Sequence, residues 1–381
     1  MSINRNQIVQ IYGTDYKENT ILLLKETGLA SLIPSVSSRI VIKPNLVSAT
    51  EASWGATTHP EIVAGIIEYL LDNNYRDITI MEGSWVGGLT SDAFDVCGYR
   101  ALSEEYDVPL VDLQKAEAVT RDCDGMELAL CKPATEIDFL INVPVLKGHC
   151  QTRITCALKN LKGLIPNSEK RRFHSMGLHK PIAHLAAALK QDFIVVDHIC
   201  GDLDFEDGGN PVVRNGIFAG RDPVLMDSLV CRMLHYKPDE VPYIPMAEKL
   251  GVGSADLDKA EIRIIESSRQ RSGKESEGKT ETDPACELPL SRKLVLVEDA
   301  VEEVDSCSAC YGSLIPALSR LQEEGFLLSG LPDKICIGQG FRGKTGRLGV
   351  GDCTCCFDNY APGCPPRENE IYQYLKQLIN M

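Results

Sequence analysis

The chain has 381 residues, of which 44% are hydrophobic and 24% are charged, and these values predict two or three folded units of an ordinary globular protein. Its formal net charge of −15 at pH 7 excludes a general nucleic-acid binder, because such proteins need a basic surface against the phosphates. No apolar run approaches the roughly 20 residues that cross a bilayer, and the amino terminus lacks the apolar core of a signal peptide, so we expect a cytoplasmic protein without membrane or nucleic-acid partners.

Short β-branched runs alternate with amphipathic segments along residues 1–265. A buried strand, "RIVIKPNLV", precedes "TTHPEIVAGIIEYLLDNNY", whose apolar residues recur at helical spacing. Further strands are predicted at "DITIMEG", "VPLVDL", "FLINVPVL" and "DFIVVDHI", the last of which follows the helical "PIAHLAAALKQ". This alternation predicts an α/β fold, a mostly parallel sheet with helices on both faces. Ligands of such sheets bind beyond the carboxyl ends of the strands.

Polar and basic side chains follow two of these strands. Lys43 and Asn45 leave the first strand, and their loop ends at Thr57, near a helix start whose N–H groups favour an anion. Lys147 and His149 directly follow the strand "FLINVPVL". No Walker loop and no G-x-G-x-x-G accompanies these loops, so nucleotide binding by a standard motif is unsupported.

The segment 147–191 is the most basic part of the chain. It contains nine lysines or arginines, four of the seven histidines and one acid, Glu169. Such an excess of positive charge in an acidic chain attracts an anion, although a solvated basic face is the alternative. We expect lysines to neutralise a carboxylate or phosphate, amides and a hydroxyl to orient it, and a histidine to move protons. The predicted substrate-binding residues are Lys43, Asn45, Thr57, Lys159, Asn160 and Lys162, and the predicted catalytic residues are Lys147, His149 and His174.

A polar stretch, 266–290, carries charges of both signs and few apolar residues, which predicts a linker or long loop. Beyond it, 291–381 reads as a small α/β unit. We expect strands at "KLVLVE" and "KICIGQG" and helices at "SLIPALSRLQEEG" and "ENEIYQYLKQLIN". Pro316 is tolerated in the first of these helices only if it lies within the first turn.

Fifteen cysteines are many for a cytoplasmic protein, where disulfides are rare, so metal or redox chemistry is the leading explanation. The tail contains a C-x-x-C pair, a Gly-Asp-Cys and a Gly-Cys-Pro-Pro. Four thiolates from such loops suit a [4Fe-4S] cluster or a structural zinc, and the uneven spacing favours the cluster over zinc and over free or disulfide cysteines. The predicted ligands are Cys307, Cys310, Cys353 and Cys364, with Cys355 and Cys356 as alternatives to Cys353.

The tail resembles the cluster-binding subunit shared by [NiFe] hydrogenases and respiratory complex I, which also runs C-x-x-C, G-x-C and G-C-P-P. In that subunit an arginine and an acidic residue often follow, as Arg367 and Glu368 do here. The resemblance is local. It favours Cys353 over Cys355 and Cys356 as the third ligand.

Five motifs earlier in the chain, "VIKPNLV", "ATTHPEIV", "VPVLKGH", "ALKNLKGLIP" and "AGRDPVLMDSL", resemble in this order the family catalogued as domain of unknown function three-sixty-two, over roughly residues 7–253. The resemblance implies an association with iron-sulfur modules and an anaerobic host. It also implies a distant similarity to the amino-terminal domain of lactate racemases, hence an α/β fold with an anionic-substrate cleft. Many members carry a two-cluster ferredoxin insert, whereas this chain has the G-C-P-P tail, so one cluster is expected. The resemblance to this family does not assign a reaction to the chain.

We therefore expect a redox enzyme, an oxidoreductase whose [4Fe-4S] cluster exchanges electrons with a small anionic substrate or cofactor. One alternative is a non-catalytic electron carrier or redox-sensing binding protein that docks to a ferredoxin-like or other redox partner. Another is a non-redox racemase or lyase with a structural or Lewis-acid cluster, although four cysteine ligands leave no iron open for a substrate.

Overall fold

The computed structural model describes residues 2–206, 208–209, 211–268, 288, 297–306 and 308–379. The chain divides into two units, which are described one at a time. Unit 1 comprises Met1–Gly148, Ile154–Arg171 and His179–Pro289, and unit 2 comprises His149–Arg153, Arg172–Leu178 and Leu290–Met381.

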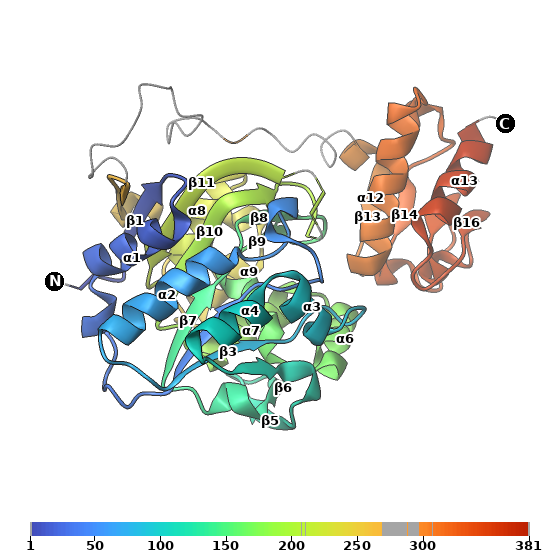
Figure 1. The fold of residues 1–381 in the computed structure, drawn as a ribbon. Helices are drawn as coiled ribbons and strands as arrows, with labels where there is room; N and C mark the ends of the chain where they lie inside the picture. The colour runs from blue at the N-terminus through green and yellow to red at the C-terminus, as the bar shows by residue number, and fades with distance from the viewer. Residues whose placement is uncertain are drawn as a thin grey trace, which may run out of the picture. The chain divides into compact units, whose positions relative to one another are not determined.

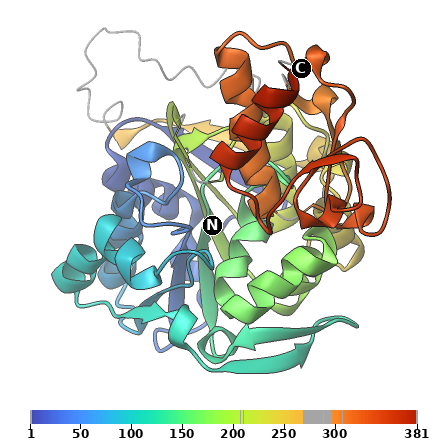
Figure 2. The same cartoon turned by 90° about the vertical axis from the view of Figure 1, so that its right-hand side faces the viewer.

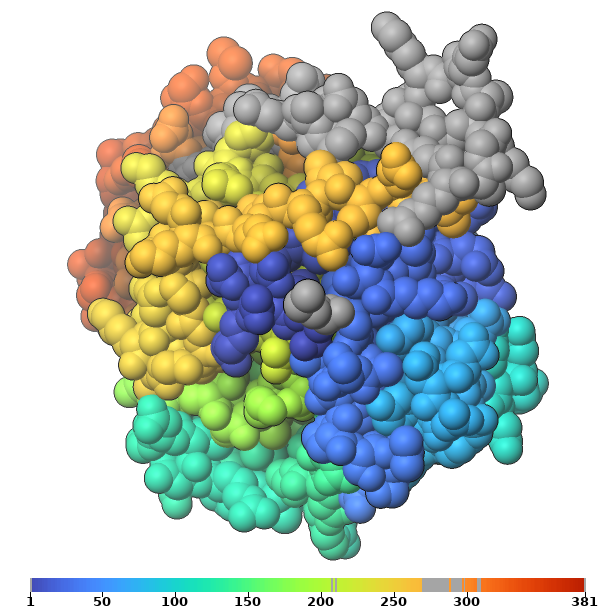
Figure 3. All heavy atoms as spheres, turned by 90° about the vertical axis from the view of Figure 1, so that its left-hand side faces the viewer, coloured from blue at the N-terminus to red at the C-terminus, as the bar shows by residue number. Residues whose placement is uncertain are grey.

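The alternating segments of unit 1 form one sheet of eight strands in the order β12-β1-β11-β10-β7-β2-β3-β4. β11 runs antiparallel to both of its neighbours, and the other neighbouring pairs are parallel, which confirms the mostly parallel sheet. β12 lies at the outer edge beside β1, as Figure 3 shows. The strands are β1 (Gln7–Tyr12), β2 (Ile40–Pro44), β3 (Ile78–Glu82), β4 (Leu110–Asp112), β7 (Phe139–Val143), β10 (Phe193–Asp202), β11 (Pro211–Gly220) and β12 (Glu261–Ile265).

Helices cover both faces of this sheet (Figures 1 and 2). One face carries α1 (Tyr16–Thr27), α2 (Pro60–Asp72), α3 (Thr90–Val96) and α4 (Tyr99–Tyr106), and the other α5 (Ala157–Asn160), α7 (His179–Ala188), α8 (Pro223–Met233) and α9 (Tyr243–Lys249). The apolar face of α2 packs into the core, as the helical spacing of its apolar residues predicts. Ile62, Ile66 and Leu70 are fully buried there. Both the α/β class and the two-sided helical cover are therefore confirmed.

Several shorter elements complete the first three hundred residues. β5 (Ala118–Asp122) and β6 (Glu127–Cys131) form an antiparallel hairpin apart from the main sheet. β8 (Lys147–His149), β9 (Arg153–Thr155) and α6 (Asn167–Met176) lie in the basic segment. The predicted linker 266–290 lies outside the described residues, apart from 266–268 and 288.

Unit 2 contains a parallel four-stranded sheet in the order β13-β14-β15-β16, and two of its helices, α12 and α13, pack against each other. β14 and α13 coincide with predicted elements. The strand predicted at "KLVLVE" lies largely outside the described residues, as does Cys307. The elements are β13 (Val301–Glu303), β14 (Ile335–Ile337), β15 (Leu348–Val350), β16 (Asn359–Ala361), α12 (Ser308–Glu323) and α13 (Glu368–Ile379).

The expected position of Pro316 was wrong. α12 begins at Ser308, so Pro316 lies in the helix interior rather than in the first turn. A proline there removes one backbone hydrogen bond and crowds the preceding turn. The helix persists because Leu314, Ile315 and Leu318 on both sides of the proline are fully buried, and burial of this size outweighs one lost hydrogen bond.

Candidate functional site

Lys43, on β2, is fully buried and forms an ion pair with Glu82 at the end of the neighbouring strand β3. Lys43 Nζ donates to both carboxylate oxygens of Glu82 at 2.9 and 3.0 Å and to the carbonyl oxygen of Pro44 at 3.0 Å. Burial lowers the pKa of Lys43, and the Glu82 carboxylate opposes this shift. The charge of Lys43 therefore has a partner inside the protein, which the sequence reasoning did not foresee.

Gly163 makes room for this pair. A Cβ atom at Gly163 would overlap the Glu82 carboxylate and the Lys43 ammonium. α5 continues through Gly163 as a short 3-10 turn, Leu161–Leu164. The glycine is thus required by the close approach of the buried ion pair.

Three of the other predicted residues form one buried polar network at the carboxyl ends of β2 and β7. Asn45 Nδ2 donates to Asn160 Oδ1 at 2.9 Å, and Asn45 Oδ1 accepts from Lys147 Nζ at 3.2 Å. Lys147 Nζ also donates to the carbonyl oxygens of Ala56 at 2.5 Å and Glu206 at 2.8 Å. The predicted residues from three loops therefore lie together, as expected for the carboxyl edge of a parallel sheet.

Lys159 and Lys162 lie beside this network. Lys159 is buried and pairs with the Glu206 carboxylate. Lys162 has no hydrogen-bond or ion-pair partner within the part of the chain that the structure describes. Burial, together with the neighbouring charge of Lys159, lowers the pKa of Lys162 to about 7.

Lys170, which the sequence analysis did not single out, adds a further buried charge. Its Nζ donates to the carbonyl oxygens of Gly83 and Ser84, both at 2.8 Å. Its pKa is lowered to about 8, mainly by burial, with the Glu82 carboxylate opposing this shift and the Lys43 charge adding to it. Glu169 and Lys170 on α6 are both buried, whereas the two arginines that follow them are exposed, so only the fold identifies which of these charges point inward.

The helix start that was expected to favour an external anion is occupied by a carboxylate of the protein. Asp197 Oδ2 accepts from the backbone N–H of His59, the N-cap residue of α2, at 2.8 Å. Thr57 is fully buried, and its hydroxyl donates to the carbonyl oxygen of Thr50 at 2.8 Å. This hydrogen bond joins two residues of the same loop. Sequence reasoning missed Asp197 because an acid in a buried strand gives no local signal of its partner.

Two of the predicted catalytic residues, His149 and His174, belong to unit 2, whereas Lys147 belongs to unit 1. His149 Nδ1 accepts from the backbone N–H groups of Gln151 and Thr152 at 3.0 and 3.1 Å. These bonds leave the proton of a neutral imidazole on Nε2. The carbonyl oxygen of His174 accepts from Gln339 Nε2 at 3.0 Å.

The cysteine loops of unit 2 meet at Gly351. The position of a Cβ atom there lies 3.8 Å from Cys310 Sγ and 3.6 Å from the carbonyl oxygen of Gly363, the residue before Cys364. Gly351 also precedes Asp352 and Cys353, and Asp352 N donates to the same Gly363 carbonyl oxygen at 3.0 Å. Cys310 therefore approaches the two loops that carry Cys353 and Cys364.

Cys353 and its neighbours differ in their surroundings. Cys353 Sγ accepts from Arg342 Nε at 3.4 Å, and its side chain is partly covered. Cys355 and Cys356 are exposed, with their sulfur atoms 4.0 Å apart. Within the described residues, which leave out Cys307, no group of three or more His, Cys, Asp or Glu side chains is arranged to hold a metal ion.

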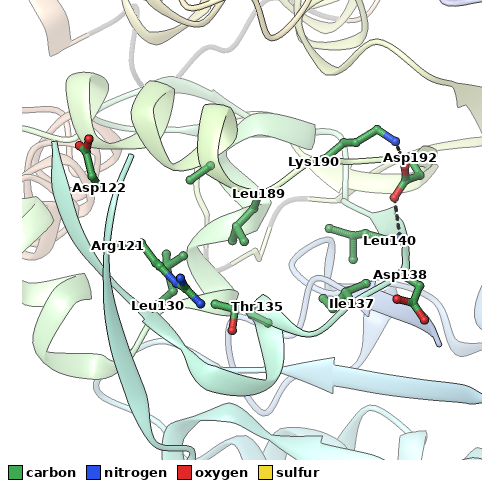
Figure 4. Close-up of a pocket in the computed structure, with 12 residues that line it drawn as sticks. Arg121, Asp122, Leu130, Thr135, Ile137, Asp138, Leu140, Leu189, Lys190 and Asp192 are labelled. Carbon is green, nitrogen blue, oxygen red and sulfur yellow. Dashed lines mark hydrogen bonds and ion pairs between the residues drawn. The ribbon is translucent and has the colours of Figure 1, made fainter. Parts of the chain in front are cut away.

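A pocket of about 390 Å³ opens at the opposite edge of the sheet in unit 1, at the amino ends of β7 and β10. Figure 4 shows Arg121, Leu130 and Thr135 on one side of it. On the other side, Asp192 accepts from Lys190 Nζ and, at 3.0 Å, from the backbone N–H of Leu140. This pocket contains none of the predicted site residues.

The family model described as "Domain of unknown function (DUF362)" matches residues 40–232, about half of the chain. The chain belongs to this family. The DUF362 region holds all the predicted substrate-binding residues and ends before the cysteine-rich tail, so the tail's likeness to hydrogenase and complex I subunits stays a prediction.

The DUF362 chain is also similar to a curated protein and to a solved structure. It is 25% identical to "Thylakoid-associated protein sll1697" of Synechocystis sp. over 237 residues, which cover 60% of this chain and 73% of that protein. The apoprotein of lactate racemase from Thermoanaerobacterium thermosaccharolyticum matches with a TM-score of 0.38 and 14% identity, over 58% of this chain and 56% of that one. Among the described residues of the DUF362 chain, every helix is too short or too polar to cross a membrane.

Proposed function

We propose that this chain is an iron-sulfur protein whose α/β unit binds a small anionic molecule and that it acts as an oxidoreductase. Cys307, Cys310, Cys353 and Cys364 would hold a [4Fe-4S] cluster in unit 2. The single observation that carries the cluster is the approach of Cys310 to Gly351, because it joins the C-x-x-C segment to the loops of Cys353 and Cys364. When bound, such a cluster supplies one-electron transfer.

The residues around the cysteines suit this role. Gly351 has φ 88° and ψ 160°, a conformation that is nearly restricted to glycine and lets the backbone come close to a ligand. Arg342 donates to Cys353 Sγ, and a hydrogen bond of this kind stabilises a thiolate and tunes a cluster that it ligates.

The lysines of unit 1 support the proposal that this unit binds an anion. Lys43 and Lys159 are paired with Glu82 and Glu206, whereas Lys162 has no partner among the described residues and Lys170 contacts neutral oxygens. Burial and like charge lower the pKa of both, against the opposing charges of Glu206 near Lys162 and Glu82 near Lys170. A carboxylate or phosphate near Lys162 would add negative charge beside these ammonium groups, with Asn45 and Asn160 as candidate orienting amides.

Anaerobic purification of the full chain, with iron and acid-labile sulfide measured per chain, tests the cluster. We expect about four irons and four sulfides per chain. Cys364→Ser should lose most of this iron, and the matched control Cys336→Ser, a partly buried cysteine of β14 outside the predicted set, should keep it. Zinc in place of iron, or equal iron in the two variants, would exclude the proposed site.

Reduction by dithionite, followed by turnover assays, separates an enzyme from a carrier. A cluster that is reduced reversibly but never reoxidised by small carboxylates or phosphates would remove the enzymatic part of the proposal. A cluster that is reoxidised by one of them, with dependence on Lys162, supports it.

A further inference from the structure

His59, Asp197 and Cys200 form a group in unit 1 that the proposed function does not use. His59 Nδ1 lies 2.8 Å from Asp197 Oδ2, and His59 Nε2 lies 3.8 Å from Cys200 Sγ. A carboxylate can only accept, so Nδ1 carries a proton and Nε2 faces the sulfur. This order of thiol, imidazole and carboxylate is the arrangement in which a base activates a nucleophile and a third group orients the base.

An irregularity in β10 creates the group. Asp197 and Cys200 are three residues apart, so on a regular strand their side chains would point to opposite faces of the sheet. The pairing of β10 with β11 shifts register between His198 and Cys200, and this irregularity lets both side chains reach His59. Bulges of this kind are frequent beside active sites, where they redirect a side chain.

The carboxylate and the imidazole are both held in place. Asp197 is fully buried, with Oδ2 also accepting from the backbone N–H of His59 and Oδ1 accepting from that of Ile199 at 2.9 Å. The Tyr16 ring lies 5.8 Å from the His59 ring, centroid to centroid, and its hydroxyl donates to Asn215 Oδ1 at 2.7 Å. These contacts fix His59 in the orientation that faces Cys200.

The surroundings favour a charged imidazole. Burial alone would lower the pKa of His59, but the Asp197 carboxylate and the Cys200 sulfur overcome this effect and raise it to about 10. Asp197 and Cys200 on β10 and Tyr16 on α1 are the titratable groups that face His59, and Glu61 lies on the first turn of α2. A protonated imidazole beside the sulfur stabilises a negative charge there, as in an imidazolium–thiolate pair.

We propose that Cys200 is a nucleophilic thiol that accepts a small acyl group, with His59 as its acid and base and Asp197 as the positioning residue. The step starts from an imidazolium–thiolate pair, in which the thiol proton of Cys200 is on His59 Nε2. A sulfur–carbon bond forms at the acyl carbon, the bond from that carbon to the leaving group breaks, and His59 gives this proton to the leaving group. The product is a thioester at Cys200. Cys200 Sγ also contacts the carbonyl oxygen of Ala52, at 3.3 Å, in the loop that precedes His59.

Cys97 is a matched control within the same chain. The exposed fractions of Cys97 and Cys200 are 4% and 3%. Cys97 Sγ lies 3.2 Å from the carbonyl oxygen of Thr50, in the same loop, but among the described residues it has no histidine partner. The two thiols are thus equally buried beside the same loop, and of the two only Cys200 lies next to an imidazole.

Alkylation of the full-length protein by iodoacetamide, followed at each cysteine by peptide mass spectrometry, tests the reactivity. We expect Cys200 to react at least about tenfold faster than Cys97 at pH 7, where an ordinary thiol is mostly protonated. His59→Gln should remove this difference and leave the rate at Cys97 unchanged. Equal rates in the wild type, or a variant that slows both cysteines together, would show that the group is only structural.

Acyl transfer is tested with p-nitrophenyl acetate. The wild type and Cys97→Ser should release an initial burst of about one p-nitrophenolate per chain, as acyl-enzyme formation predicts, and Cys200→Ser should not. A burst that survives in Cys200→Ser, or a reactive Cys200 that gives no burst, would overturn the acyl assignment. Circular dichroism of each variant verifies that it is folded.

Discussion

Lys43 and Glu82 form an ion pair that water hardly reaches, because the side chains of Lys43 and Glu82 are 0% and 3% exposed. Glu82→Gln leaves the lysine charge buried without a counter-charge, so we expect a loss of about 3–5 kcal/mol in the free energy of unfolding. Urea denaturation at pH 7 measures this loss in the free energy of unfolding. The exposed pair of Lys132 and Glu117 is the control, since Glu117→Gln should cost less than about 1 kcal/mol. Equal losses of unfolding free energy in the two variants would show that breaking the buried pair costs no more than breaking an exposed one.

Lys162 makes anion binding depend on pH. Its pKa of about 7 means that the charged form, which binds an anion, dominates below pH 7 and declines above it. We expect the affinity for sulfate, whose charge is constant from pH 6 to 9, to fall by up to about tenfold per pH unit above pH 7. Calorimetric titration measures this slope.

Lys162→Met should bind sulfate weakly and with little pH dependence. Lys25→Met changes an exposed lysine of α1 and serves as the control, because it should keep the slope of the wild type. The same slope in both variants would mean that another group governs binding.

At the scale of elements, the turn between β15 and the Cys353 loop depends on Gly351. An alanine there must adopt φ 88° and ψ 160° and place a methyl group 3.8 Å from Cys310 Sγ. We expect Gly351→Ala to cost about 1–3 kcal/mol of stability and to lower the iron content of the anaerobically purified chain.

Gly343→Ala separates these two effects. Gly343 also has a positive φ, 73°, but a Cβ atom there would meet nothing within 4 Å. The Gly343→Ala variant should therefore lose stability through backbone strain but keep the iron content of the wild type. Loss of iron in both variants would show that general destabilisation, and not the approach to Cys310, releases the metal.

At the scale of the whole molecule, each unit has its own sheet, and only unit 2 carries the predicted ligands. Removal of iron with a chelator and an oxidant should accelerate amide hydrogen exchange in α12 and in the loops of Cys353 and Cys364. Exchange in β2, β7 and β10 should stay unchanged, because these strands are buried in the core of unit 1. Equal acceleration in both sheets, or none, would contradict a cluster confined to unit 2.

Local patterns determined much of the fold. Alternating strands and helices predicted the parallel sheet of unit 1, and the apolar spacing of α2 predicted its buried face, because both depend on near neighbours in the chain. The placement of Lys43, Asn45 and Lys147 at the carboxyl edge followed from their position after strands. β1, β11 and β12 were not predicted, and their pairing joins segments from both ends of unit 1.

The sequence by itself determined the α/β class, the basic segment and the cysteine spacing of the tail. Only the tertiary structure decided which charges have internal partners. Glu82 neutralises Lys43 across 39 residues, and Asp197 reaches His59 across 138. The register shift in β10 likewise brings Cys200 to His59 across 141 residues. The physical reason is that the partner of a buried charge and the register of a strand are set by packing between distant segments, which local composition does not record.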